Sequence, residues 1–127
     1  MAIKLLGDAT EVKKGLDHIN EFYPYVSQHL NKPIMAFYQG EKNESSIEIV
    51  NVNDAWHIRF GRRCDFFRAL GCVLTEGERF NLLHENAVYE KCGVMLDVSR
   101  DAAYTVTQLK EFFVWIALCG LNTCYLY

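Results

Sequence analysis

The chain has 127 residues, which is enough for one ordinary domain and too few for two well-filled ones. Hydrophobic residues make up 50% and charged residues 23%, so the chain can bury a core and is not disordered by composition. With 13 Lys and Arg against 16 Asp and Glu, the formal net charge is −3. Binding to phosphate groups requires clustered positive charge, so this balance argues against a dedicated partner of nucleic acid or of an anionic membrane.

Length and hydropathy exclude two further classes. No apolar run approaches the roughly 20 residues that span a bilayer, and residues 1–8 lack the long apolar segment of a secretory signal. We therefore expect a soluble cytoplasmic protein. A complete (β/α)8 barrel takes about 250 residues, so the chain is too short to be one.

The cysteines and histidines predict neither a metal site nor a cofactor. The five cysteines are odd in number, form no Cys-x-x-Cys pair and stand among apolar neighbours: Cys64, Cys72, Cys92, Cys119 and Cys124. We expect small buried thiols in a reducing compartment rather than metal or redox groups. The four histidines are scattered along the sequence without the spacing of a metal site.

The first 38 residues predict a helix followed by a strand. Asp8 and Glu11 have the three-residue spacing of a capping box. Apolar residues follow at helical intervals: Val12, Leu16, Ile19 and Tyr23. Pro24 should end this helix, and residues 25–30 should add a short helical turn. Residues 34–38, Ile-Met-Ala-Phe-Tyr, are typical of a strand.

Residues 47–60 predict a β-hairpin. Apolar residues alternate with polar ones on both sides of an Asn53-Asp54 turn: Ile47, Ile49 and Val52 before it, and Trp56, Ile58 and Phe60 after it. Residues 64–74 then predict a helix, and residues 78–91 are polar and without periodicity, so we expect a linker there. The order helix, strand, hairpin, helix predicts an α+β domain in which helices pack on a small, mainly antiparallel sheet.

After residue 91 the pattern changes to that of a parallel unit. Residues 93–98 form a nearly continuous apolar run, typical of a strand buried on both faces. Thr105 and Gln108 have the spacing of another capping box, and Gly120 stands where a helix commonly ends. The expected inner face of that helix is Val106, Leu109, Phe113, Ile116 and Ala117. With residues 123–127 as a second apolar strand, the segment predicts one βαβ unit with a parallel strand pair.

A lone βαβ unit cannot cover its own apolar faces. We expect either that further chain follows Tyr127 or that a partner supplies the cover. An unpaired apolar strand pair invites edge pairing between chains, so we also expect a homo-oligomer that forms through this segment.

Residues 92–127 resemble a known family of enzymes. The stretch Cys92-Gly-Val-Met-Leu-Asp-Val-Ser-Arg-Asp101 contains a Leu-Asp-x-Ser-Arg motif, and a helix separates it from Gly120-Leu-Asn122-Thr-Cys-Tyr-Leu-Tyr127. In motif, helix length and second strand, this is similar to the start of the catalytic domain of family 20 glycoside hydrolases, the β-N-acetylhexosaminidases. The resemblance implies that residues 91–127 are the first βαβ segment of a TIM barrel that is incomplete in this chain. It also implies that residues 1–90 are the small non-catalytic α+β domain that commonly precedes this barrel.

The family's chemistry sets the expected function. Its members remove terminal N-acetylhexosamine from glycans with retention, and the acetamido oxygen of the substrate attacks the anomeric carbon in place of a protein nucleophile. An adjacent Asp-Glu pair on a later barrel strand orients the acetamido group and serves as general acid and base. No adjacent Asp-Glu pair occurs among the 127 residues. The resemblance therefore implies a parent enzyme that acts on N-acetylhexosamine-containing glycans, no catalytic residue in this chain, and no activity of the chain alone.

One residue of the family's substrate site has a counterpart here. Arg100, which ends the Ser-Arg motif, matches the arginine that hydrogen-bonds hydroxyl groups of the terminal sugar. It follows the strand 94–98, and barrel enzymes place their sites at the carboxyl ends of the strands. A guanidinium also offers several fixed donors to neighbouring hydroxyls. The other interpretation is that Arg100 only pairs with Asp97 or Asp101. Asp97 is expected to support the strand end and to have no catalytic role.

Two other groups of residues leave a second function open. Four arginines lie close together in the sequence near a predicted helix start, where an anion could bind: Arg59, Arg62, Arg63 and Arg68. Their acidic neighbours favour the other interpretation, a solvated charged face. Adjacent aromatic residues on a helix point about 100° apart, so Phe112 and Trp115 should face a neighbouring helix or domain. The alternative to a glycosidase fragment is a stand-alone α+β module that binds a protein or a glycan.

Overall fold

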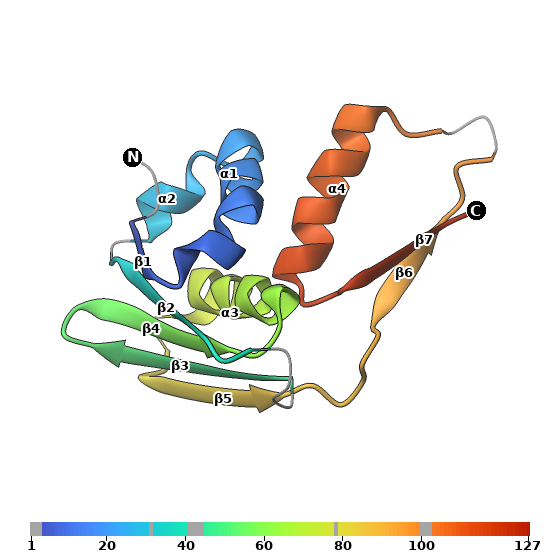
Figure 1. Cartoon of the computed structure of the whole chain (residues 1–127). Coiled ribbons are helices and arrows are strands. Elements are labelled where there is room, and N and C mark those ends of the chain that lie inside the picture. The colour runs from blue at the N-terminus through green and yellow to red at the C-terminus, as the bar shows by residue number, and fades with distance from the viewer. Residues whose placement is uncertain (1–3, 31, 41–44, 78, 100–102) are drawn as a thin grey trace.

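The computed structural model describes residues 4–30, 32–40, 45–77, 79–99 and 103–127. It shows an α+β fold with a five-stranded sheet and a separate two-stranded sheet (Figure 1). The first sheet and its helices, which we call the five-stranded block, comprise β1 Leu5–Gly7, η1 Ala9–Glu11, α1 Lys13–Phe22, α2 Val26–His29, β2 Ile34–Tyr38, β3 Ser46–Val52, β4 Ala55–Phe60, α3 Arg63–Glu76 and β5 Leu82–Asn86. The βαβ unit follows as β6 Gly93–Leu96, α4 Val106–Leu118 and β7 Thr123–Leu126.

The five-stranded sheet is mixed, which corrects the expectation of a mainly antiparallel one. Its strand order is β1-β2-β4-β3-β5. β2 pairs in parallel with both β1 and β4, whereas β3 pairs antiparallel with both β4 and β5. The chain crosses over between β1 and β2 through α1, and such a crossover brings the two strands into parallel pairing. The direction of pairing depends on which strands become neighbours in the sheet, and local sequence periodicity does not predict those neighbours.

The hairpin of β3 and β4 is confirmed. Asn53 and Asp54 have φ values of 50° and 60°, the left-handed conformation that a two-residue hairpin turn requires. Ile49 pairs with Ile58, and both side chains are fully buried on the face that the helices cover. Val52 is exposed instead of buried, because it lies an odd number of residues from Ile49 and side chains alternate between the faces of a strand.

Helices α1 and α3 lie on one face of this sheet and build the core against it (Figure 1). Pro24 ends α1 and the short α2 follows, as expected. The expected capping box at Asp8 is wrong: Val12 precedes α1 without a side-chain cap, and the Asp8 carboxylate accepts a 3.0 Å hydrogen bond from the backbone N–H of Tyr38. Asp8 therefore ties the loop after β1 to the end of β2.

Residues 78–91 are not a linker throughout, because β5 lies within them. β5 pairs antiparallel with β3, from Leu82 opposite Val50 to Asn86 opposite Ser46. As an edge strand it carries exposed residues on its open face, so it lacks the apolar alternation that identifies a half-buried strand. Its partner β3 determines its conformation more than its own sequence does.

The βαβ unit has the predicted order and the predicted parallel pairing, with Gly93 opposite Thr123 and Leu96 opposite Leu126. The Thr105–Gln108 capping box at the start of α4 is also confirmed. The burial is different from the expectation: Met95 on β6 is 71% exposed and Val106 on α4 is 70% exposed. Within the described part of α4, Val114 is the buried residue, and α4 packs on α3 and α1.

A close helix crossing joins the two parts. A Cβ atom placed on Gly71 of α3 would lie 2.0 Å from the carbonyl oxygen of Leu118 at the end of α4. Gly71 is therefore a point of close backbone approach between the five-stranded block and the βαβ unit. Among the described helices, none is long and apolar enough to cross a membrane.

Candidate functional site

The carboxyl ends of β6 and β7 lie at the same end of the parallel pair, as Figure 1 shows. Backbone hydrogen bonds close this end: the N–H of Tyr127 donates to the carbonyl oxygen of Leu96 over 2.8 Å, and the N–H of Val98 donates to that of Tyr127 over 2.8 Å. Parallel strands of an α/β unit carry ligand sites at their carboxyl ends. We call this edge, with Asp97 and Ser99, the strand-end site.

Asp97 organises the turn that leaves β6. Its Oδ1 accepts a 2.9 Å hydrogen bond from the backbone N–H of Ser99 and a 2.5 Å bond from the Ser99 hydroxyl. The hydroxyl bond and then the backbone bond hold the pKa of Asp97 below its ordinary value, so the carboxylate is ionised at neutral pH. The expectation that Asp97 supports the strand end is confirmed by these bonds.

Arg100 and Asp101 lie outside the residues that the structure describes. Contact of Arg100 with a sugar thus stays a prediction, and its pairing with either carboxylate stays the other interpretation. The described residue before Arg100 is Ser99, which lies in the turn that Asp97 organises after β6.

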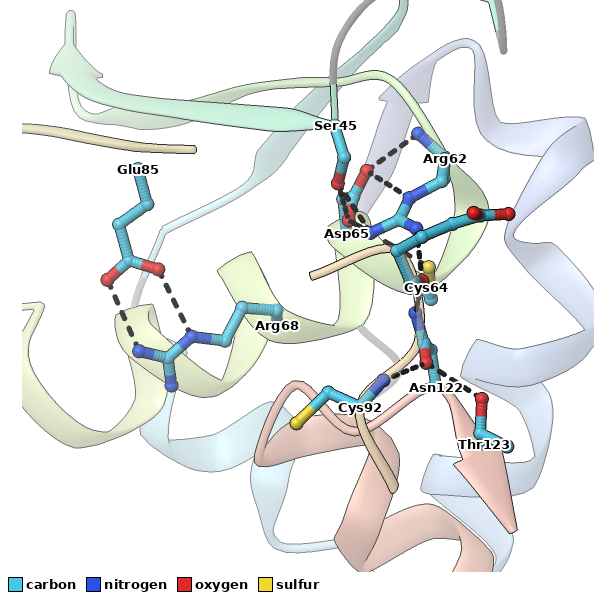
Figure 2. Close-up of polar contacts among 10 residues, drawn as sticks. Ser45, Arg62, Cys64, Asp65, Arg68, Glu85, Cys92, Asn122 and Thr123 are labelled. Atoms are coloured by element: carbon cyan, nitrogen blue, oxygen red, sulfur yellow. Dashed lines mark hydrogen bonds and ion pairs between the residues drawn. The ribbon is translucent and has the colours of Figure 1, made fainter. Parts of the chain in front are cut away.

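A second polar cluster joins the five-stranded block to the βαβ unit (Figure 2). The Arg62 guanidinium donates to both carboxylate oxygens of Asp65 and to the Ser45 hydroxyl. Its Nη1 donates over 2.9 Å to the carbonyl oxygen of Glu90, and Asn122 Nδ2 donates to the same oxygen over 2.9 Å. These side chains come from segments that are far apart in the sequence, so no local spacing pointed to the cluster.

Asn122 is the member of this cluster that the sequence singled out, through the Gly-x-Asn pattern. Its Oδ1 accepts a 2.9 Å hydrogen bond from the N–H of Cys92 and a 3.0 Å bond from the Thr123 hydroxyl. Its backbone N–H donates to the carbonyl oxygen of Cys92 over 2.9 Å. Asn122 therefore fastens the segment before β6 to the start of β7, at the end of the pair opposite the strand-end site.

The four clustered arginines do not form an anion site. Each pairs with a carboxylate: Arg59 with Glu48, Arg62 with Asp65, Arg63 with Glu11, and Arg68 with Glu85. A guanidinium already neutralised in this way attracts a further anion weakly. Arg62 and Arg68 also line a junction cavity of about 390 Å³, together with Cys92 and Cys119. The charged side chains that line this cavity pair with one another, Arg62 with Asp65 and Arg68 with Glu85.

The thiols differ in burial, which corrects the expectation that all are buried. Cys72 is buried, Cys64 and Cys124 are half-buried, and Cys92 and Cys119 are exposed. Burial raises the pKa of the Cys64 and Cys72 thiols, so these two are protonated and unreactive near neutral pH. Within the described ranges, no three histidine, cysteine or acidic side chains gather in a way that could hold a metal ion.

Comparisons with known proteins show a likeness of fold. No family model and no curated protein matches the sequence. The fold matches the crystal structure of a GH20 exo-β-N-acetylglucosaminidase from Vibrio harveyi in complex with N-acetylglucosamine, with a TM-score of 0.65 and 17% sequence identity. This likeness shows that the chain is folded like part of that enzyme. The match covers 99% of this chain and 22% of that enzyme, so the chain spans about a fifth of the enzyme's length.

Proposed function

We propose that the chain is the N-terminal part of a glycoside hydrolase that removes terminal N-acetylhexosamine from glycans by substrate-assisted, retaining hydrolysis. Residues 1–90 form its non-catalytic α+β domain, and residues 91–127 form the first βαβ segment of its (β/α)8 catalytic domain. The fold likeness to the Vibrio harveyi enzyme carries this proposal, because one match extends over both segments and 99% of the chain.

The exposed sides of α4 support a barrel. Val106 and Trp115 stand nine residues apart on the helix, which at about 100° per residue places them half a turn apart. Trp115 is 60% exposed and Val106 is 70% exposed, whereas Val114 between them is buried. In a (β/α)8 barrel every helix has a neighbouring helix on each side. Two opposite apolar flanks on one helix fit that arrangement.

The strand pair supports the same arrangement. Met95 and Tyr125 are register partners, so their side chains share one face of the β6–β7 sheet, and both are largely exposed. A parallel sheet occurs almost only with both faces covered. In a barrel, that face points inward and packs in layers with side chains from the other strands.

Within the proposed enzyme, the chemistry is shared between this chain and the rest of the barrel. Arg100 donates hydrogen bonds to hydroxyl groups of the terminal sugar, and Asp97 fixes the turn that presents it. The Asp-Glu pair that orients the acetamido group and transfers the proton belongs to a later strand, since the 127 residues contain no adjacent Asp-Glu pair. The chain alone therefore binds no transition state and is inactive.

The test is to extend the reading frame beyond Tyr127 and to express the complete product. We expect the remainder of a barrel with an adjacent Asp-Glu pair, and release of the aryl group from an aryl N-acetyl-β-glucosaminide. Arg100→Lys should lower kcat/KM at least about tenfold, as expected for loss of a charged hydrogen bond. Arg63→Lys is the matched control, because Arg63 pairs with Glu11 on the five-stranded block. A frame that closes without an Asp-Glu pair would overturn the proposal.

One observation favours the second candidate, a stand-alone glycan-binding module. Tyr104, Phe112 and Trp115 line a depression of about 240 Å³ with Gln108 and Glu111. Aromatic rings beside amide and carboxylate groups suit a sugar, which presents both apolar faces and hydroxyls. Calorimetric titration of the 127-residue chain with chitobiose decides between the two. Binding that Trp115→Ala abolishes supports the module, and absence of heat supports the glycosidase fragment.

A further inference from the structure

One face of the five-stranded sheet is open in the described part of the chain. Figure 1 shows helices α1 and α3 on one side of this sheet and no described element on the other. Two of its four strand pairs are parallel, β1 with β2 and β2 with β4. Parallel strands occur almost only in sheets whose two faces are both covered. This open face is therefore a candidate interaction surface.

A row of side chains crosses the open face from one edge of the sheet to the other. The register aligns one residue from each strand, in the order Leu6, Met35, His57, Val50 and Leu82. Their sequence neighbours Ile34, Ile49 and Ile58 are buried in the core, and side chains alternate between the faces of a strand. Four of the five residues are apolar, and the row ends in Leu6, 40% exposed, and Leu82, 62% exposed. We call these five residues the open-face row.

The open-face row has nearly the same pattern in both directions, because an apolar pair flanks the central histidine on each side. A two-fold axis parallel to β4, the middle strand, would lay the row of a second copy over the first in the opposite order. Leu6 would then face Leu82 of the second copy, and Met35 would face its Val50. Stacked sheets lie about 10 Å apart with their strands within about 30° of each other, so side chains of this size fill the space between them.

The charges beside the row fit the same two-fold axis. Arg59 lies on the middle strand and forms an ion pair with Glu48 on β3, to one side of it. The Arg59 guanidinium also lies 5.8 Å from the ring centre of Phe37 on β2, to the other side. The axis would place Glu48 of the second copy over Phe37, so that each guanidinium lies between two carboxylates, one from each copy. These carboxylates offset the repulsion between the two guanidinium groups near the axis.

We propose that the open face is the interface of a homodimer, in which the open-face rows of two copies of the chain pack against each other in opposite order. A second copy fits this face better than an unrelated protein does, because the apolar row and the charges beside it are both self-complementary under one axis. The surface lies outside the βαβ unit, and the inference does not depend on the proposed function.

The first test changes the leucines at the two ends of the row. Leu6→Lys and Leu82→Glu each place a charge against an apolar residue of the second copy, so each should raise the dissociation constant of the dimer at least about tenfold. Analytical ultracentrifugation over a range of protein concentrations measures this constant, and circular dichroism checks that the variants fold. The double variant Leu6→Lys/Leu82→Glu should dimerise at least about tenfold more tightly than either single variant, because each lysine then faces a glutamate of the other copy. Within one copy these positions are about 19 Å apart, four strand spacings of about 4.8 Å, so they cannot pair internally.

The second test mixes the two single variants, which separates loss of the interface from loss of the fold. In the mixed dimer, the lysine of one chain faces the glutamate of the other at one end of the row, and two leucines still face each other at the opposite end. The mixture should therefore form dimers at least about tenfold more tightly than either variant does alone. Added salt should weaken this gain, because it screens exposed charge pairs.

Two substitutions outside the row are the controls. Val88→Glu changes a residue that is 86% exposed in the loop after β5, and Met95→Glu changes one that is 71% exposed on β6. Both should leave the dimer unchanged. A monomeric wild type would overturn the inference and leave the open face to another partner. A mixture of single variants that stays monomeric would overturn it too, as would a dimer that Met95→Glu alone disrupts, since association would then run through the βαβ unit.

Discussion

The contact at Gly71 offers a sharp test of how the two parts of the chain are joined. A Cβ atom at this position would lie 2.0 Å from the Leu118 carbonyl oxygen and 3.0 Å from its carbonyl carbon. Both atoms belong to the backbone at the end of α4, so neither can turn away as a side chain would. Gly71→Ala therefore forces α4 to move away from α3.

Gly15 provides the matched comparison. A Cβ atom at Gly15 would lie 2.3 Å from Cζ of Phe67, the far end of a side chain that can shift. Replacing a helical glycine by alanine gains roughly 1 kcal/mol in helix propensity, and overpacking costs about 1–3 kcal/mol. The propensity gain applies to both substitutions. Gly71→Ala should therefore have a free energy of unfolding about 1–3 kcal/mol lower than that of Gly15→Ala.

The assay is urea unfolding of both variants and the wild type, followed by circular dichroism. Hydrogen exchange should also show that Gly71→Ala loosens α4, β6 and β7 while the pairing of β3 with β4 stays protected. If Gly71→Ala were as stable as Gly15→Ala, the close helix crossing would not exist as described. If Gly71→Ala instead lowered the protection of both sheets equally, the βαβ unit would not behave as an element separate from the five-stranded block.

Three further predictions concern single groups. The Asp97 carboxyl should titrate below its ordinary value of 3.8, and Ser99→Ala should move the NMR midpoint back toward that value. The folded-state pKa is lower than the unfolded-state pKa, so the ionised carboxylate stabilises the turn at pH values above the unfolded-state pKa. This stabilisation is lost as the pH falls through the folded-state pKa. A midpoint unmoved by Ser99→Ala would refute the hydrogen bond between the Ser99 hydroxyl and Asp97. Iodoacetamide at pH 8 should alkylate exposed Cys119 well before buried Cys72, and mass spectrometry showing the reverse order would contradict the packing of α3. Trp115→Ala should change the stability of the 127-residue chain by less than about 0.5 kcal/mol but destabilise the complete protein by about 3 kcal/mol or more, as measured by urea unfolding; equal small effects in both would remove the evidence for a covered flank.

The elements that the sequence predicted well are those with strong local determinants. The hairpin has alternating apolar residues on both sides of a turn whose Asn53 and Asp54 tolerate positive φ. Helix α4 begins at a capping box made by Thr105 and Gln108, two residues that contact each other within one turn. In both cases the residues that specify the structure are close neighbours in the chain.

The elements that the sequence did not predict are specified by distant partners. β5 is a strand because β3 offers it a free edge, and its own exposed Leu82 and His84 carry no strand pattern. The parallel pairing of β2 with β4 likewise depends on the crossover and not on either strand alone. An edge strand and a strand order are properties of the assembled sheet.

The same distinction applies to the candidate site. Asp97 was predicted to support the strand end from its place in the Leu-Asp-x-Ser-Arg motif, and its partner Ser99 belongs to the same motif, two residues away. The contacts of Arg62 and Asn122 with the Glu90 carbonyl oxygen were not predicted, because the acceptor is a backbone carbonyl and the two donors are 28 and 32 residues away from it. Every residue has a backbone carbonyl, so no sequence motif indicates which carbonyl oxygen a distant side chain will contact.

The most direct test of the central claim is to measure aryl-group release from an aryl N-acetyl-β-glucosaminide, comparing the 127-residue chain with the product of the complete reading frame. We predict turnover by the complete product, inhibition by N-acetylglucosamine and no turnover by the chain alone. Absence of turnover by the complete product, or turnover by the 127 residues alone, would contradict the assignment of this chain to the first part of an N-acetylhexosaminidase.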